Sequence, residues 1–99
     1  MEMNYDFLEE MEDFLGGTFH QDIDSPEEAI EEFITESSIE CLVFTVQYCE
    51  DFLKCDMTIK EKEDFIKKNT DIFFPSIELT PIKWLLSAVE QITEAINNK

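Results

Sequence analysis

The chain has 99 residues, 43% of them hydrophobic, and a formal net charge of −17 at pH 7. This length suits one small domain with a single core, and the apolar content argues against intrinsic disorder. The charge is uneven, because residues 1–53 hold 16 of the 24 acidic side chains and no Lys or Arg. A half this acidic argues against binding nucleic acid or an anionic membrane surface, and it favours a basic partner.

Apolar residues recur at helical spacing along almost the whole chain. The spacing predicts a first helix over residues 5–15. Gly16 and Gly17 then predict its end, because glycine readily adopts the left-handed conformation that closes helices. Residues 18–24 are expected to form a loop.

Two capping signals predict the next helices. Ser25 can cap, Pro26 fits the first helical position, and Glu28 completes a capping box, so a second helix begins here. A second capping box over residues 37–40 predicts a third helix, residues 39–55, whose apolar side chains are spread around it. Such a helix is normally central and covered on several sides.

The C-terminal part repeats these signals. Residues 58–61 form a third capping box that predicts a short helix. Residues 71–79 contain a proline and lack helical spacing, which predicts an extended connector whose Phe73 and Phe74 fill the core. A cap followed by proline at residues 80–81 predicts the last helix.

The fold class expected is therefore all-α, with residues 1–99 forming one small domain of about five helices packed around a central apolar helix. Cys41, Cys49 and Cys55 are an odd number without CxxC spacing, which favours reduced thiols, mostly in the core of a cytoplasmic protein. One disulfide plus a free thiol stays open as an alternative. No 18-residue apolar run or signal-peptide pattern is present, so no membrane segment is predicted.

His20 is the only histidine, and Asp22 and Asp24 lie near it in sequence. These carboxylates could orient a catalytic base or hold a metal ion. A calcium loop counted from Asp22, however, would place Pro26 and Glu27 where an oxygen donor and a glycine are needed. We therefore expect a structural histidine and no metal site.

No motif for enzymatic chemistry is present. GxSxG, a Gly-rich phosphate loop and HExxH are all absent, and every basic residue is a lysine. Paired carboxylates are so abundant that no single pair predicts glycosidase-type chemistry. The sequence predicts neither an enzyme nor a cofactor.

The stretches FLGGTFHQD, residues 14–22, and SPEEAIEEF, residues 25–33, resemble the N-terminal motif of the immunity proteins of contact-dependent growth inhibition (CDI) systems. Thr18 and Ile23 replace a tyrosine and a tryptophan that are usual in that motif, and the residues WL at 84–85 resemble its closing helix. Motif residues shared across relatives with varied toxins are expected to serve the fold. They are Gly16, Gly17, Phe19, His20, Gln21, Ser25, Pro26 and Trp84.

The resemblance implies a small cytoplasmic protein that binds one cognate CdiA C-terminal toxin domain, and the acidic charge argues against direct contact with nucleic acid or membrane. Such toxins are often nucleases, many of them acting on tRNA, and a nuclease groove is basic because it attracts phosphates. The acidic half then supplies the predicted contacts. The residues expected to bind the toxin are Glu9, Glu10, Asp13, Asp22, Asp24, Glu27, Glu31, Glu32 and Glu36.

Two other functions fit the same charge pattern. An acidic surface can imitate nucleic acid and inhibit a DNA-binding protein, as an anti-restriction factor does. A helical adaptor without inhibitory activity could also use acidic helix faces for solubility alone.

Overall fold

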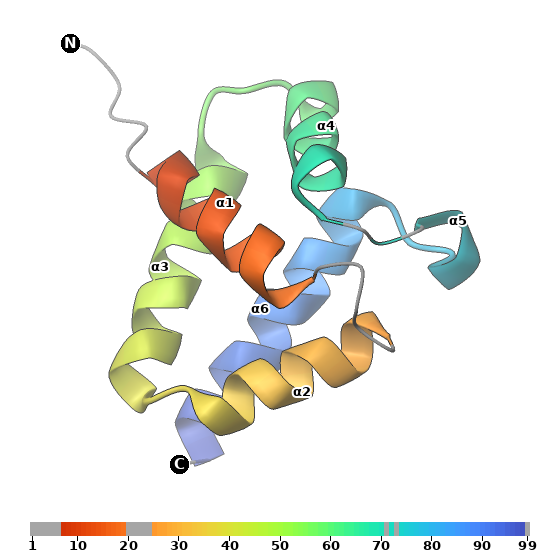
Figure 1. Ribbon diagram of the computed structural model, residues 1–99. Coiled ribbons are helices and arrows are strands. Elements are labelled where there is room, and N and C mark those ends of the chain that lie inside the picture. Colours follow the sequence, from red (N-terminus) through yellow and green to blue (C-terminus); the bar gives the residue numbers. More distant parts are fainter. Residues whose placement is uncertain (1–6, 20–24, 71, 73, 99) are drawn as a thin grey trace, which may run out of the picture.

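The computed structural model describes residues 7–19, 25–70, 72 and 74–98, and within these ranges it contains helices and no strand (Figure 1). Five helices of eleven or more residues and one four-residue helix follow in chain order. They are α1 (Phe7–Thr18), α2 (Pro26–Glu36), α3 (Ile39–Lys54), α4 (Ile59–Asn69), α5 (Phe74–Ile77) and α6 (Pro81–Asn98). The predicted all-α class with about five helices is confirmed.

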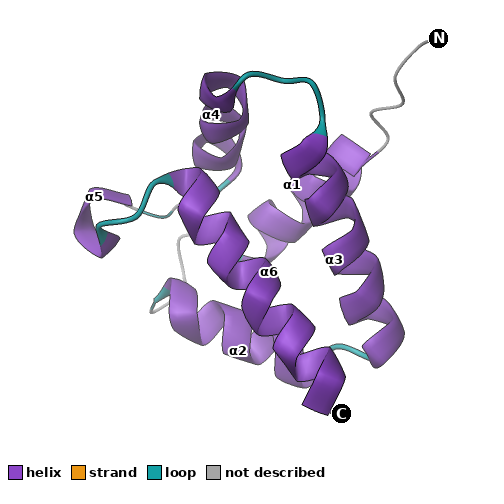
Figure 2. Ribbon diagram, turned by 180° about the vertical axis from the view of Figure 1, so that it is seen from behind, coloured by secondary structure: helices purple, strands orange, loops and turns teal. Residues whose placement is uncertain are grey.

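The helices form a body about two helices thick, with a smallest extent of 19 Å. Helices α1 and α2 lie in front in Figure 1, and α6 lies in front in the reverse view of Figure 2. Helix α3 packs on both α1 and α6, while α6 also packs on α4 and α2. The centre of the fold is therefore shared by α3 and α6.

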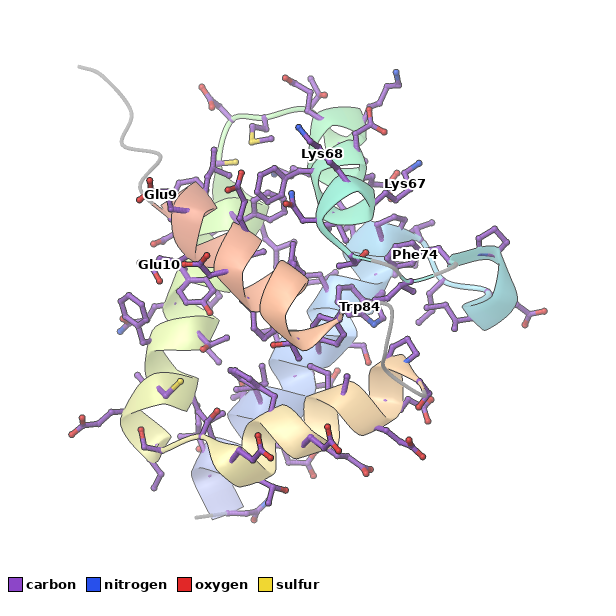
Figure 3. All side chains as sticks on the ribbon, viewed as in Figure 1. Glu9, Glu10, Lys67, Lys68, Phe74 and Trp84 are labelled. Atoms are coloured by element: carbon purple, nitrogen blue, oxygen red, sulfur yellow. The ribbon has the colours of Figure 1, made fainter. Side chains whose placement is uncertain are left out.

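A continuous run of aromatic rings crosses the core. Phe14 meets Phe33 at 5.0 Å and Phe19 at 5.6 Å between ring centroids, and Phe19 lies edge-on to Trp84 at 4.7 Å. Trp84 also contacts Phe74, at 5.8 Å (Figure 3). Edge-to-face pairs of this kind add about 0.5–1.5 kcal/mol each beyond simple burial. They tie α1, α2, α5 and α6 into one core.

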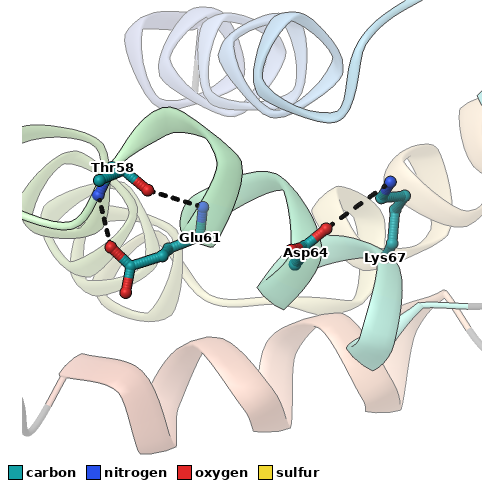
Figure 4. A network of polar contacts seen from close by, with 4 residues as sticks. All are labelled: Thr58, Glu61, Asp64 and Lys67. Atoms are coloured by element: carbon teal, nitrogen blue, oxygen red, sulfur yellow. Dashed lines mark hydrogen bonds and ion pairs between the residues drawn. The ribbon is translucent and has the colours of Figure 1, made fainter.

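Local capping chemistry sets most helix starts. Ser25 Oγ accepts a hydrogen bond from the Glu28 amide at 3.1 Å, and Thr80 Oγ1 accepts one from the Lys83 amide at 3.2 Å. The complete capping box is at α4, where Thr58 and Glu61 exchange bonds of 3.0 and 3.1 Å (Figure 4).

The cap of α3 is one residue later than predicted. Ser38, not Ser37, accepts the Cys41 amide at 3.1 Å, and Ser37 instead ends α2 with its N–H bonded to the Phe33 carbonyl. The capping box expected over residues 37–40 is therefore wrong, because the chain places Glu40 at the second helical position.

Gly16 and Gly17 do not end α1. Both lie inside the helix, which runs to Thr18, and neither has a positive φ. The amide of Phe19 still bonds to the Leu15 carbonyl at 3.0 Å. The predicted role of these glycines in closing the helix is wrong, because the chain continues in right-handed helical geometry through them.

The predicted extended connector is also only partly correct. Phe74 to Ile77 form the short helix α5, with Pro75 tolerated in its first turn, where no amide donor is needed. Phe74 is buried as predicted. Phe73 lies outside the described residues.

Lys62 joins α4 to the end of α3. Its Nζ donates a hydrogen bond of 2.6 Å to the Leu53 carbonyl, and its side chain is 8% exposed. The last carbonyls of a helix have no partner within the helix, and a lysine there also complements the helix dipole. This lysine therefore has a structural role.

Candidate functional site

Helix α1 turns its acids outward. Met11, Phe14 and Leu15 are buried on its inner face, so the spacing leaves Glu9 and Asp13 on the opposite, exposed face. Glu10 is also exposed, on the flank toward α3, and Figure 3 shows it with Glu9 on the same flank of the molecule.

Helix α2 is built in the same way. Its inner face buries Ala29 and Ile30. Its outer face carries a shallow surface depression, lined by Glu28, Glu31, Glu32, Thr35 and Glu36. Three predicted contact residues thus line one depression, while Glu27 is exposed beside it. Glu28 also lines it, although its sequence position indicated only a capping role.

We call the exposed carboxylates of α1 and α2 the acidic side. It comprises Glu9, Glu10, Glu12, Asp13, Glu27, Glu28, Glu31, Glu32 and Glu36. Helix α3, which follows in the chain, carries three further exposed acids: Glu40, Glu50 and Asp51. All 12 acids described between Phe7 and Leu53 are therefore exposed.

Basic residues are found elsewhere. Lys54, the first in the chain, ends α3 and lies 3.6 Å from Glu50 in a solvent-exposed pair. Lys67 on α4 pairs with Asp64 at 3.8 Å, and Figure 3 places Lys67 and Lys68 together on α4, away from Glu9 and Glu10. Exposed pairs of this kind contribute little stability. Among the described residues, no acid of α1 or α2 forms an ion pair with a lysine.

Helix α3 is less covered than its composition indicated. Its sides toward α1 and α6 are packed, but its remaining face is exposed and carries Ile39, Val43 and Phe44. Sequence reasoning missed this apolar surface. The sequence did hold one signal for it. The apolar residues of α3 are spread around the whole helix, and they are more numerous than a single core-facing stripe requires.

Two buried groups beneath this face hold their protons. Burial raises the pKa of the Cys49 thiol to about 12. Burial also raises the pKa of Tyr48 to about 12, against the hydrogen bond with Thr45, and the nearby Glu10 carboxylate adds to the rise. Both groups are neutral at pH 7, so neither is an activated nucleophile or base.

The cysteines are all free thiols. Cys49 and Cys55 are buried, as predicted for most of them, and Cys41 is exposed on α3. Among the described residues, no group of three or more His, Cys, Asp and Glu side chains could hold a metal ion. Four predicted site residues lie outside the described residues: His20, Gln21, Asp22 and Asp24.

The search for membrane-spanning helices covers the described part of the chain alone. No helix there is both long enough and apolar enough to cross a bilayer.

The comparisons with known proteins bear on the motif at the junction of α1 and α2. The family described as CdiI immunity protein matches residues 7–92. The chain belongs to this family. The match spans α1 through most of α6, so the CdiI assignment rests on nearly the whole helical body and not on the motif alone. No curated protein and no solved structure matches the chain.

Proposed function

We propose that this CdiI immunity protein neutralises a cognate CdiA C-terminal toxin domain that is a nuclease. In this proposal the acidic side docks on the toxin's basic substrate groove and excludes the nucleic acid. The observation that carries the proposal is the charge of residues 7–53, whose 12 described acids are all exposed and accompanied by no lysine or arginine.

The chemistry of a nuclease explains why such a surface fits. A groove that binds nucleic acid carries Lys and Arg side chains toward the phosphates. Carboxylates on α1 and α2 present negative oxygen atoms that pair with the same basic groups. An inhibitor that occupies these groups removes the means by which the toxin holds its substrate.

The same charge pattern also favours rapid capture. Complementary fields raise association rate constants toward about 10⁸–10⁹ M⁻¹s⁻¹ at low salt. Speed matters because we expect the toxin to be captured in the cytoplasm before it cuts its substrate. The family assignment favours this function over a nucleic-acid mimic or a plain adaptor. The extent of the immunity domain over residues 1–99 stays a prediction.

The first test measures binding between the purified chain and the toxin domain encoded directly upstream of its gene. We expect affinity to fall steeply between about 50 and about 200 mM salt, because added salt shortens the Debye length, to about 10 Å at about 0.1 M, and screens exposed charges that lie farther apart than this. Glu31→Gln/Glu32→Gln should slow association, whereas Glu90→Gln/Glu94→Gln, which removes the same charge from exposed positions of α6, should not. Absence of binding would overturn the proposal, and salt-independent affinity would overturn its electrostatic part.

The second test addresses occlusion. A catalytically inactive toxin domain is bound to a labelled RNA or DNA substrate, and the immunity protein is added in increasing amounts. We expect the substrate to be released as the immunity protein binds. A ternary complex that retains the substrate would show that the active-site groove stays open, which contradicts occlusion and leaves toxin binding standing.

A further inference from the structure

The exposed face of α3 carries an apolar surface at its N-terminal end. Ile39, Val43 and Phe44 are 43%, 38% and 52% exposed and lie within about one and a half turns of the helix. The core does not need them, because Leu42, Cys49 and other residues of α3 already fill its inner face. We call Ile39, Val43 and Phe44 the α3 patch.

The α3 patch packs on buried residues of the core. The Phe44 ring lies edge-on to Tyr48 at 5.3 Å, and Tyr48 lies against Phe14 of the core at 6.2 Å. The Tyr48 hydroxyl donates to Thr45 Oγ1 at 3.3 Å, and Thr45 donates to the Cys41 carbonyl at 2.8 Å. Phe44 thus packs on the buried Tyr48 ring, whose hydroxyl is held by the hydrogen bond to Thr45. A side chain ordered in advance loses less entropy on binding.

The surroundings of the α3 patch are acidic. Glu36 precedes it, Glu40 lies within it, and Glu50 and Asp51 follow on the exposed side of α3. The nearest lysine along the chain is Lys54, at the far end of the helix and paired with Glu50. Protein–protein interfaces combine apolar and aromatic anchors with nearby charges, and aromatic residues in them carry much of the binding energy.

We propose that the α3 patch is the apolar anchor on which a basic protein domain docks, namely the nuclease toxin of the proposed function, on which this inference rests. The carboxylates around the patch select the partner, since they fit a surface of Lys and Arg. A second copy of this chain fits poorly, because a two-fold contact over α3 would bring Glu40 and its neighbours against the same acids.

The anchor and the acidic side have separable effects. Phe44→Ala removes contact area and no charge, so it should speed dissociation and leave the salt dependence unchanged. Loss of an aromatic hot spot costs at least about 30-fold in Kd. Glu31→Gln/Glu32→Gln should instead slow association and flatten the salt dependence. Phe44→Ala therefore tests the apolar anchor, and Glu31→Gln/Glu32→Gln tests the electrostatic attraction of the toxin.

The test compares Phe44→Ala with a matched control, Ile59→Ala. Ile59 is 69% exposed at the start of α4, at the opposite end of α3 from the patch (Figure 1). We expect a Kd increase of at least about 30-fold for Phe44→Ala and less than about threefold for Ile59→Ala. Val43→Lys, which keeps the Phe44 ring but sets a cation against a basic partner, should also weaken binding. Circular dichroism checks that each variant is folded.

The reactivity of Cys41 gives a second test of toxin binding at the α3 patch, and it needs no mutation. Its exposed thiol lies one turn from Phe44 along α3, whereas Cys49 and Cys55 are buried. Toxin bound at the α3 patch should slow alkylation of Cys41 by iodoacetamide at least about tenfold at concentrations well above Kd. Alkylation at an unchanged rate in the complex would contradict the placement of the toxin.

The outcomes separate the two proposals. If the wild-type chain does not bind the toxin, the proposed function and this inference both fail. If it binds and Phe44→Ala binds equally well, the inference alone fails. If sedimentation shows a dimer of the free chain that Phe44→Ala abolishes, the α3 patch serves a second copy, and the inference is again overturned.

Discussion

The two halves of the helical body use charged side chains differently. In residues 54–98, Lys62 binds the end of α3, Glu61 completes a capping box, and Asp64 pairs with Lys67. In residues 7–53, the described acids all face solvent, and the carboxylates of α2 make no hydrogen bond or ion pair with other described residues. In the second half, Lys62 and Glu61 therefore satisfy helix ends, whereas the acids of the first half have no such structural bond among those described.

This difference makes stability and binding separable by mutation. Charges that satisfy buried or helix-terminal groups should affect unfolding, whereas charges of the acidic side should affect binding. The predictions below test that separation, beginning with the largest expected effect.

Removal of the Lys62 amine should destabilise the protein most. Lys62→Met keeps an apolar stem but leaves the Leu53 carbonyl without its 2.6 Å hydrogen bond. We expect the free energy of unfolding to fall by about 1–3 kcal/mol in urea titrations, because an unsatisfied buried polar group bears its desolvation cost. Lys60→Met, at an exposed site on the same helix, is the control and should change it by less than about 0.5 kcal/mol. Equal effects would contradict a structural role for Lys62.

Alkaline pH should destabilise the core beneath α3. The Cys49 thiol has a pKa of about 12 in the folded protein, raised by burial from 9.0. Between these values the unfolded chain loses the proton and the folded chain keeps it. Stability is therefore full below pH 9 and falls as pH rises, by at most about 1.4 kcal/mol per pH unit from this group. In Cys49→Ala the free energy of unfolding should decline less steeply from pH 9 to 11 than in the wild-type chain. An equal slope in both would contradict a raised pKa of the Cys49 thiol.

Gly17→Ala should stabilise the protein. Gly17 is helical and has no positive φ, and apart from its chain neighbours and the backbone of its own helix, no atom lies within 4 Å of the position that a Cβ would take. Alanine in a helix interior is favoured over glycine by about 0.5–1 kcal/mol, and we expect a gain of that size in thermal or urea unfolding. Gly16→Ala is the companion variant, since its Cβ would meet the Asn69 carbonyl oxygen at an ordinary 3.8 Å. A loss of stability in Gly17→Ala would show that the motif needs a glycine conformation here.

The smallest effect on stability is expected from the acidic side. Glu31→Gln/Glu32→Gln removes two exposed charges from α2 and should shift the free energy of unfolding by no more than about 0.5 kcal/mol. The same double variant should weaken toxin binding, so the two measurements move independently. A large loss of stability would mean that these acids have a structural role, and it would remove the contrast between the two halves.

The sequence predicted local chemistry better than packing. Thr58 with Glu61, and Ser25 with Pro26, start helices where expected, because a cap depends only on a few adjacent residues. The helix end expected at Gly16 and Gly17 is wrong, since whether glycine closes a helix depends on the φ that the surrounding fold imposes. Tertiary contact also decides α5, where Phe74 packs on Trp84.

The candidate site divides in the same way. Helical spacing correctly placed Glu9, Asp13 and the acids of α2 on exposed faces, because the buried stripes of α1 and α2 are narrow and regular. The spread of apolar residues around α3 indicates more of them than one core-facing stripe requires, but tertiary contacts decide that Phe44 is one of those left exposed.

Carboxyl footprinting of the complex tests the central claim most directly. Exposed carboxylates are coupled to glycine ethyl ester with and without saturating toxin domain, and each modified site is measured by mass spectrometry. The account predicts strong protection of Glu9, Glu10, Glu31 and Glu32, while Glu90 and Glu94 on α6 react as in the free protein. Protection confined to α4 and α6, with the acids of α1 and α2 still fully reactive, would contradict it.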